Sequence, residues 1–142
     1  MSEHDEQVKL FQWAAHRLGV YPELALMFAI PNAGKRRGSQ GGWMVAEGLK
    51  RGVPDIMLCA ARGGYHGLFL ELKHGRNKAT VEQLYWQERL LIQGYRADVV
   101  YEFEGARAAI IAYLELQPCG HPRGAIRGDG VTHWCSACED EA

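Results

Sequence analysis

The chain has 142 residues, 47% of them hydrophobic, and a formal net charge of −1 at pH 7. Its length fits one domain with one small appendage, and its hydrophobic share is typical of a globular protein rather than a disordered one. No run approaches the ~20 apolar residues that a membrane-spanning helix needs. The first six residues include three acids and no apolar segment, so we expect no signal peptide and a cytoplasmic location.

The near-zero net charge hides a basic centre. Nine lysines and arginines lie between residues 35 and 78, against three acids, which leaves a local balance of +6 (nine minus three). Such a balance suits a polyanionic substrate whose phosphates must be attracted. A solvated surface with scattered charges is the alternative that the charges alone leave open.

The N-terminal residues 3–18 are expected to form a helix. Ser2 or Asp5 is suited to cap its first turn. The expected buried stripe follows spacings of three and four residues: Val8, Phe11, Ala15 and Leu18.

Residues 21–42 are rich in proline and glycine and are expected to be mostly irregular, with a short strand or helix at 24–30. The turn at 31–38 carries three adjacent cations, Lys35, Arg36 and Arg37. Arginines and backbone NH groups in such a loop suit contacts with phosphates, and a solvated loop is the alternative. A short helix is expected at 43–50.

Residues 52–73 have the pattern of a β-hairpin, because two short apolar runs flank a glycine-rich turn. Side chains alternate along a strand, so Glu71 and Lys73 share one face with Phe69, while three leucines form the face toward the core. If the strands pair antiparallel, Asp55 at the start of the first lies beside Glu71 near the end of the second. Two carboxylates and a lysine on a half-buried sheet suit a divalent metal ion, although each alone is more often structural. Cys59, in the first run, is expected to be a small core residue.

The C-terminal half of the domain begins with a capping box. Thr80 and Gln83 have its spacing and open a helix that ends near residue 93. A strand is expected at 96–103 and a last helix at 104–116. This alternation indicates an α/β or α+β sheet covered by helices. The expected buried side of the helix at 80–93 comprises Val81, Leu84, Tyr85, Leu91 and Ile92.

The last part of the chain has the pattern of a zinc site. Cys119 and His121 form a Cys-x-His pair, and Cys135 and Cys138 form a Cys-x-x-Cys pair. Two close pairs of sulfur and nitrogen ligands fit tetrahedral Zn²⁺, which would also order a segment too poor in apolar residues to fold alone. His133 is an alternative to His121. A disulfide between the last two cysteines is the alternative to the metal, and a reducing compartment disfavours it.

The hairpin resembles the motif of the PD-(D/E)xK nuclease superfamily, and more specifically of its VRR-NUC branch. The likeness covers about residues 3–115, and the cysteine-rich tail resembles the small zinc ribbons appended to many phage nucleases. The residues that carry the resemblance are Glu3, Gln7, Pro31-Asn32, Gly52-Val53-Pro54-Asp55, Glu71-Leu72-Lys73, Gln83 and Trp86.

The resemblance implies a fold and a reaction. The fold would be α/β, a restriction-endonuclease-like mixed sheet flanked by helices at 1–116, followed by a zinc-ribbon-like segment at 117–142. The reaction would be hydrolysis of phosphodiester bonds in DNA with Mg²⁺ or Mn²⁺. Stand-alone bacterial and phage members look like dimeric, structure-selective endonucleases, which implies a homodimer acting on branched or junction DNA, in the host cytoplasm if the gene is phage-borne.

The resemblance also implies roles for individual residues. Asp55, Glu71 and the Leu72 carbonyl would ligate the metal, and Glu3 would complete or support the site. Lys73 would orient the attacking water. Gln83 would hold the lysine or the region of the scissile phosphate, and Glu6 is an alternative to Glu3. The residues expected to contact DNA are Asn32, Lys35, Arg36, Arg37, Lys50, Arg76 and Lys78.

Two other functions remain open at this point. One is a zinc-dependent nucleic-acid-binding adaptor without catalysis, in which the basic loop and the cysteine tail bind DNA and the acids are structural. The other is a restriction-like nuclease of the same superfamily.

Overall fold

The computed structural model describes residues 1–31, 45–116, 126–128 and 133–135. The elements of the main body that lie wholly within these ranges are α1 (Glu3–His16), η1 (a 3₁₀ helix, Pro22–Leu26), β1 (Met27–Ala29), β2 (Ile56–Leu58), β3 (Leu68–Lys73), α3 (Val81–Ile92), β4 (Arg96–Tyr101) and α4 (Glu102–Leu114). β5 (Ile126–Gly128) and β6 (His133–Cys135) form a separate antiparallel pair. Among the helices of the described ranges, none is long and apolar enough to cross a membrane.

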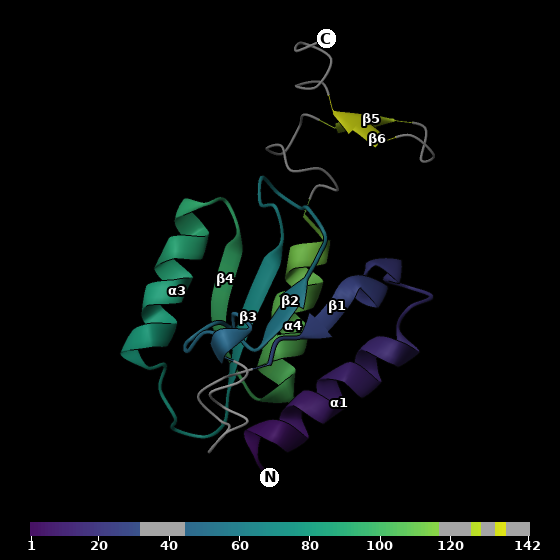
Figure 1. The fold of residues 1–142 in the computed structure, drawn as a ribbon. Coiled ribbons are helices and arrows are strands. Elements are labelled where there is room, and N and C mark those ends of the chain that lie inside the picture. Colours follow the sequence, from purple (N-terminus) through teal and green to yellow (C-terminus); the bar gives the residue numbers. More distant parts are fainter. Residues whose placement is uncertain (32–44, 117–125, 129–132, 136–142) are drawn as a thin grey trace.

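The four strands of the main body form one mixed sheet in the order β1-β2-β3-β4 (Figure 1). β2 pairs antiparallel with both β1 and β3, and its register with β3 sets Ile56 opposite Leu70. β4 pairs parallel with β3 after the crossover through α3. The predicted hairpin and the predicted mixed sheet with flanking helices are therefore confirmed, and the segment at 24–30 contains both of its alternatives, η1 and β1.

The core lies on the leucine face of β3. Leu68, Leu70 and Leu72 are each 1% exposed and belong to one apolar cluster with Leu10 of α1 and Ile110 of α4. In Figure 1, α4 runs behind the sheet. Burial of apolar surface stabilises a fold by ~25 cal/mol per Å², so this face holds the two helices to the sheet.

The start of α1 is capped as predicted. Asp5 N donates a hydrogen bond of 3.3 Å to Ser2 Oγ, and Ser2 N donates one of 2.7 Å to Asp5 Oδ2. This reciprocal capping box satisfies two NH groups that the first turn leaves without partners.

The predicted stripe of α1 is largely wrong, and of its members Phe11 alone packs against the core. Val8 and Leu18 are 42% and 41% exposed, and the buried side chains of the helix are Glu6, Leu10 and Ala14. These three lie four residues apart on one face, which packs against α4 and β3. Apolar spacing alone allows more than one stripe on this helix, and the contact with α4 selects among them.

The predicted buried side of α3 is also wrong. The one buried residue of this helix is Gln83, because the helix turns its polar and mixed face toward the sheet. The five residues expected to be buried are 45 to 82% exposed: Val81, Leu84, Tyr85, Leu91 and Ile92.

Two further expectations need correction. The sheet is not half-buried at β3, because all six residues of the strand are buried, including Glu71 (4% exposed) and Lys73 (7% exposed). Cys59 is exposed rather than part of the core. It follows the end of β2, where its backbone N donates a 3.2 Å hydrogen bond to Leu26 O.

The structure describes only some of the residues for which the sequence predicts a role. Val45 and Ala46 are helical, within the short helix expected at 43–50. His133 and Cys135 are the first and last residues of β6. The predicted residues outside the described ranges are Asn32, Lys35, Arg36, Arg37, Cys119, His121 and Cys138.

We expect Leu10→Ala to lower the free energy of unfolding by about 2–5 kcal/mol, because a fully buried leucine leaves a cavity. Val8→Ala, on the exposed side of the same helix, should change it by less than about 0.5 kcal/mol. Urea denaturation followed by circular dichroism measures both values. Equal losses in the two variants would show that α1 packs through a different face.

Candidate active site

Asp55 lies directly before β2, at the end of the sheet where β3 stops. It is 6% exposed, its Oδ2 accepts a 2.9 Å hydrogen bond from Leu72 N, and its backbone carbonyl accepts one of 2.7 Å from Ile30 N. Because β2 and β3 are antiparallel, the first residue before one strand meets the last residues of the other. The predicted placement of Asp55 beside Glu71 follows from this register.

Glu71 and Lys73 project from β3 to one face of the sheet. Lys73 Nζ lies 3.4 Å from Glu71 Oε1, and both side chains are more than nine-tenths buried. A buried ion pair requires good geometry and further partners to offset its desolvation. The site therefore brings two carboxylates and one ammonium group together in a place with little water.

The pKa of Glu71 is raised well above its usual value. Burial, and after it the neighbouring Asp55 carboxylate, together raise its pKa to about 8, although Lys73 acts in the opposite direction. Two close carboxylates that share one small site cannot both ionise easily without a compensating charge. Perturbation of this kind is typical of functional sites.

One oxygen of Glu71 lacks a partner. Oε2 is buried and has no hydrogen-bond partner among the residues that the structure describes. A buried carboxylate oxygen without a partner is unfavourable, and a divalent cation would satisfy it. Together with Asp55 it offers the carboxylate oxygens that Mg²⁺ and Mn²⁺ prefer, so the residues present fit such an ion.

Gln83 connects the start of α3 to this site. Its Nε2 donates a 2.5 Å hydrogen bond to Glu71 Oε1, while its Oε1 accepts one of 2.8 Å from Thr80 N. The predicted capping box is present, with Gln83 N donating to Thr80 Oγ1 at 3.2 Å. One amide side chain therefore caps a helix and orients a buried carboxylate.

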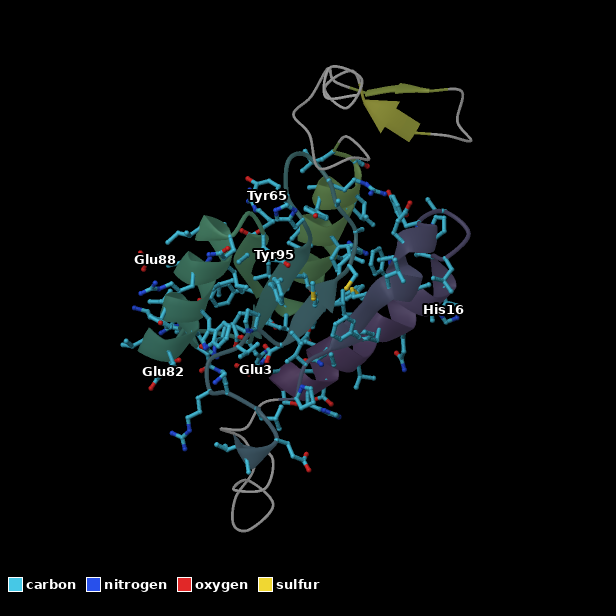
Figure 2. All side chains as sticks on the ribbon, turned by 45° about the horizontal axis from the view of Figure 1, so that its top comes forward. Glu3, His16, Tyr65, Glu82, Glu88 and Tyr95 are labelled. Carbon is cyan, nitrogen blue, oxygen red and sulfur yellow. The ribbon has the colours of Figure 1, made fainter. Side chains whose placement is uncertain are left out.

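Glu3 lies at the same end of the molecule. It is half-buried at the start of α1, and its Oε1 accepts a 3.0 Å hydrogen bond from Asn77 Nδ2 in the loop between β3 and α3. Figure 2 shows Glu3 far from Tyr65 and Tyr95, which lie toward the opposite end of the sheet. The bond holds the first turn of α1 to the loop that follows Lys73.

Glu6 belongs to a different cluster. Its Oε2 accepts a 2.7 Å hydrogen bond from Phe103 N, and its carboxylate lies near His74 and Glu102, with one ligand atom of each residue within 4.8 Å of the others. His74 Nδ1 lies 2.6 Å from Glu102 Oε2, and Gly75 N donates to Glu102 Oε1 at 2.8 Å. These contacts occupy Glu6 on the face of the sheet that α1 covers, whereas Glu71 projects to the other face.

Sequence reasoning missed the cluster of Glu6, His74 and Glu102. Its members come from α1, the loop after β3 and the start of α4, and no spacing along the chain links them. It also missed Asn77 as the partner of Glu3. Only the fold brings such residues together, so no local pattern could have found them.

Three exposed cations lie in the loops that adjoin Asp55 and Lys73 in the chain. Lys50 lies in the loop before Asp55, and Arg76 and Lys78 lie in the loop after Lys73; all three are exposed. Their exposure and position suit contacts with a polyanion beside the carboxylates.

Comparisons with known proteins give one informative likeness. No family model matches the sequence, and no curated protein matches it. A solved structure described as a "VRR_NUC domain protein" superposes with a TM-score of 0.73 and 26% sequence identity, over 87% of this chain and 97% of that chain. The likeness supports a VRR-NUC fold, which is a nuclease fold, for the main body of this chain.

The raised pKa of Glu71 predicts how stability depends on pH in the metal-free protein. Between the ordinary carboxyl pKa of 4.5 and about 8, the folded state binds more protons than the unfolded state. The free energy of unfolding should therefore fall as pH rises through this window, by at most about 1.4 kcal/mol per pH unit for one proton.

Urea denaturation in EDTA at several values between about pH 5 and pH 8 measures this slope. Glu71→Gln should flatten it, and Glu115→Gln, which removes an exposed acid after α4, should leave it as in the wild type. An unchanged slope in Glu71→Gln would assign the pH dependence to other groups.

Proposed function

We propose that this protein is a metal-dependent endodeoxyribonuclease that hydrolyses phosphodiester bonds, with a preference for branched or junction DNA. The observation that carries the proposal is the buried set of Asp55, Glu71 and Lys73, with one carboxylate oxygen lacking a partner, in a VRR-NUC fold. A purely structural ion pair would not need a second buried acid beside it.

Asp55 and Glu71 are the residues that would hold Mg²⁺ or Mn²⁺, with the Leu72 carbonyl as a further ligand and Glu3 completing the site. Such an ion, when bound, lowers the pKa of a bound water and neutralises charge that develops on the phosphate. The burial of both acids keeps competing water away, which strengthens each charge interaction in the site.

Two further side chains, Lys73 and Gln83, act at the proposed metal site. Lys73 Nζ, 3.4 Å from Glu71 Oε1, supplies a fixed positive charge that orients the attacking water. Gln83 fixes the orientation of the Glu71 carboxylate through its 2.5 Å hydrogen bond. Prearranged donors and charges of this kind provide much of the rate enhancement in hydrolysis.

The DNA would lie over the carboxylate end of the sheet. The exposed residues Lys50, Arg76 and Lys78 support this placement, because they flank Asp55 and Lys73 in the chain. The remaining proposed contacts lie outside the described residues, in a segment that the sequence alone predicts to be a turn: Asn32, Lys35, Arg36 and Arg37.

The cysteine tail is proposed to hold structural Zn²⁺ through Cys119, His121, Cys135 and Cys138, in a segment separate from the nuclease domain. The Cys-x-His and Cys-x-x-Cys spacings support it. The zinc content of the purified protein tests it, and a content well below one per chain would contradict it.

A homodimer is part of the proposal, and the outer face of α3 supports it. This face combines the five exposed apolar residues Val81, Leu84, Tyr85, Leu91 and Ile92 with Glu88, which Figure 2 shows on the outer side of the helix. Arg89, placed over the Tyr85 ring at 4.9 Å, gives the opposite charge beside it. A second copy related by a two-fold axis would cover the apolar residues and could pair Glu88 with Arg89.

The catalytic proposal predicts the loss of cleavage in three variants. Asp55→Asn, Glu71→Gln and Lys73→Met should each lower Mn²⁺-dependent cleavage by about 100-fold or more, because each removes a ligand or a fixed charge. The assay uses supercoiled plasmid and linear, flapped and four-way DNA, with EDTA as the metal-free control.

The variant Glu115→Gln, which removes an exposed acid after α4, should cleave like the wild type. Salt-sensitive DNA binding without cleavage by the wild type would favour the adaptor instead, and retained cleavage in all three site variants would exclude this mechanism. Equal rates on all DNA forms would remove the preference for branched substrates.

The dimer proposal predicts that Leu84→Glu yields a monomer, because it places a charge in the centre of the apolar face. Size-exclusion chromatography with light scattering measures the mass of the wild type and the variant. Val20→Glu, at a residue that is 60% exposed outside α3, should keep the wild-type mass. A wild type that is monomeric at high concentration would end this part of the proposal.

A further inference from the structure

The two acid-bearing segments of the proposed site are both held by the first two turns of α3. Gln83 reaches Glu71 on β3, as described above. Trp86, three residues later on the same side of the helix, donates from Nε1 to the backbone carbonyl of Arg51 at 3.0 Å. Arg51 lies four residues before Asp55. Helix α3 therefore contacts both the loop that leads to Asp55 and the side chain of Glu71.

Gly52 brings the loop against α3 more closely than another residue would. It is buried, its φ is +85°, and a Cβ built on it would lie 2.6 Å from the Glu82 carbonyl carbon and 2.7 Å from the Glu82 carbonyl oxygen. A positive φ and backbone in the way both exclude a side chain there. The peptide between Arg51 and Gly52 therefore rests directly on the helix at the level of Glu82 and Trp86.

The loop after this contact is short and stiff. Only Val53 and Pro54 separate Gly52 from Asp55, and the proline fixes one backbone angle. A displacement of Arg51 and Gly52 is therefore transmitted to Asp55 over a few bonds.

We propose that Trp86 is a positioning residue: its hydrogen bond to the Arg51 carbonyl, with Gly52 seated on Glu82, sets where Asp55 stands relative to Glu71 and so sets the affinity of the pair for a divalent cation. The inference rests on the proposed function, since it concerns the same pair of acids. Groups that orient metal ligands without touching the metal typically change affinity by about 10–100-fold when removed.

Two substitutions separate the hydrogen bond from the bulk of the ring. Trp86→Phe keeps an aromatic ring and removes the donor. Trp86→His removes the benzene part of the indole, and its Nε2 occupies the place of the indole Nε1 when the two five-membered rings are superposed. Above about pH 7.5 the imidazole is neutral and can donate from that nitrogen.

The experiment measures Mn²⁺ binding by isothermal titration calorimetry without DNA, and the Mn²⁺ concentration that gives half-maximal cleavage. We expect Trp86→Phe to weaken Mn²⁺ binding by about tenfold, with cleavage at saturating Mn²⁺ within about threefold of the wild type. Trp86→His should bind Mn²⁺ more tightly than Trp86→Phe. Trp13→Phe, the same change at a half-buried tryptophan of α1, should bind like the wild type.

The outcomes separate the two levels of the argument. A wild type that binds no Mn²⁺ and cuts no DNA contradicts the proposed function. A wild type that does both, with unchanged Mn²⁺ affinity in Trp86→Phe, overturns the role of Trp86 alone. Weaker binding in Trp86→His than in Trp86→Phe would overturn it too, because ring packing would then matter more than the hydrogen bond.

Discussion

The antiparallel pairing of β2 with β3 is the constraint on which the candidate site depends. Asp55 is not on the same strand as Glu71, and only the register that sets Ile56 opposite Leu70 places the two carboxylates side by side. The hydrogen bond from Leu72 N to Asp55 Oδ2 fixes this arrangement at the end of the strand pair. A slip of one residue would turn Glu71 and Lys73 toward the leucine core, where neither charge has a partner.

The charged residues on which the proposed function depends are unfavourable for the stability of the fold. Two buried acids and one lysine are unfavourable for the empty protein, and the raised pKa of Glu71 expresses this. The leucine face of the same strand offsets the disadvantage, because Leu68, Leu70 and Leu72 anchor β3 between the helices and its neighbours. A strand buried on both faces can therefore hold charges rigidly that an exposed edge would leave mobile.

Local patterns in the sequence predicted some of these features and not others. The alternation of β3 and the two-strand hairpin were readable because a strand has a period of two, and the Thr80–Gln83 capping box has a fixed spacing. The buried faces of α1 and α3 were not, since Leu10 against Val8, or Gln83 against Leu84, is decided by the partner surface rather than by the helix. The link from Gln83 to Glu71 and the cluster of Glu6, His74 and Glu102 depend on the complete fold.

The first residue of α4, Glu102, has an unusual backbone conformation. Among the described residues other than glycine, only Glu102 has a positive φ, of 60°, and it follows β4 without any connecting loop. A left-handed backbone at such a residue stores on the order of 1 kcal/mol or more, and a glycine would release it. The carboxylate offsets that strain by accepting a hydrogen bond from Gly75 N and lying 2.6 Å from His74 Nδ1, so the left-handed residue also ties the start of α4 to the loop after Lys73.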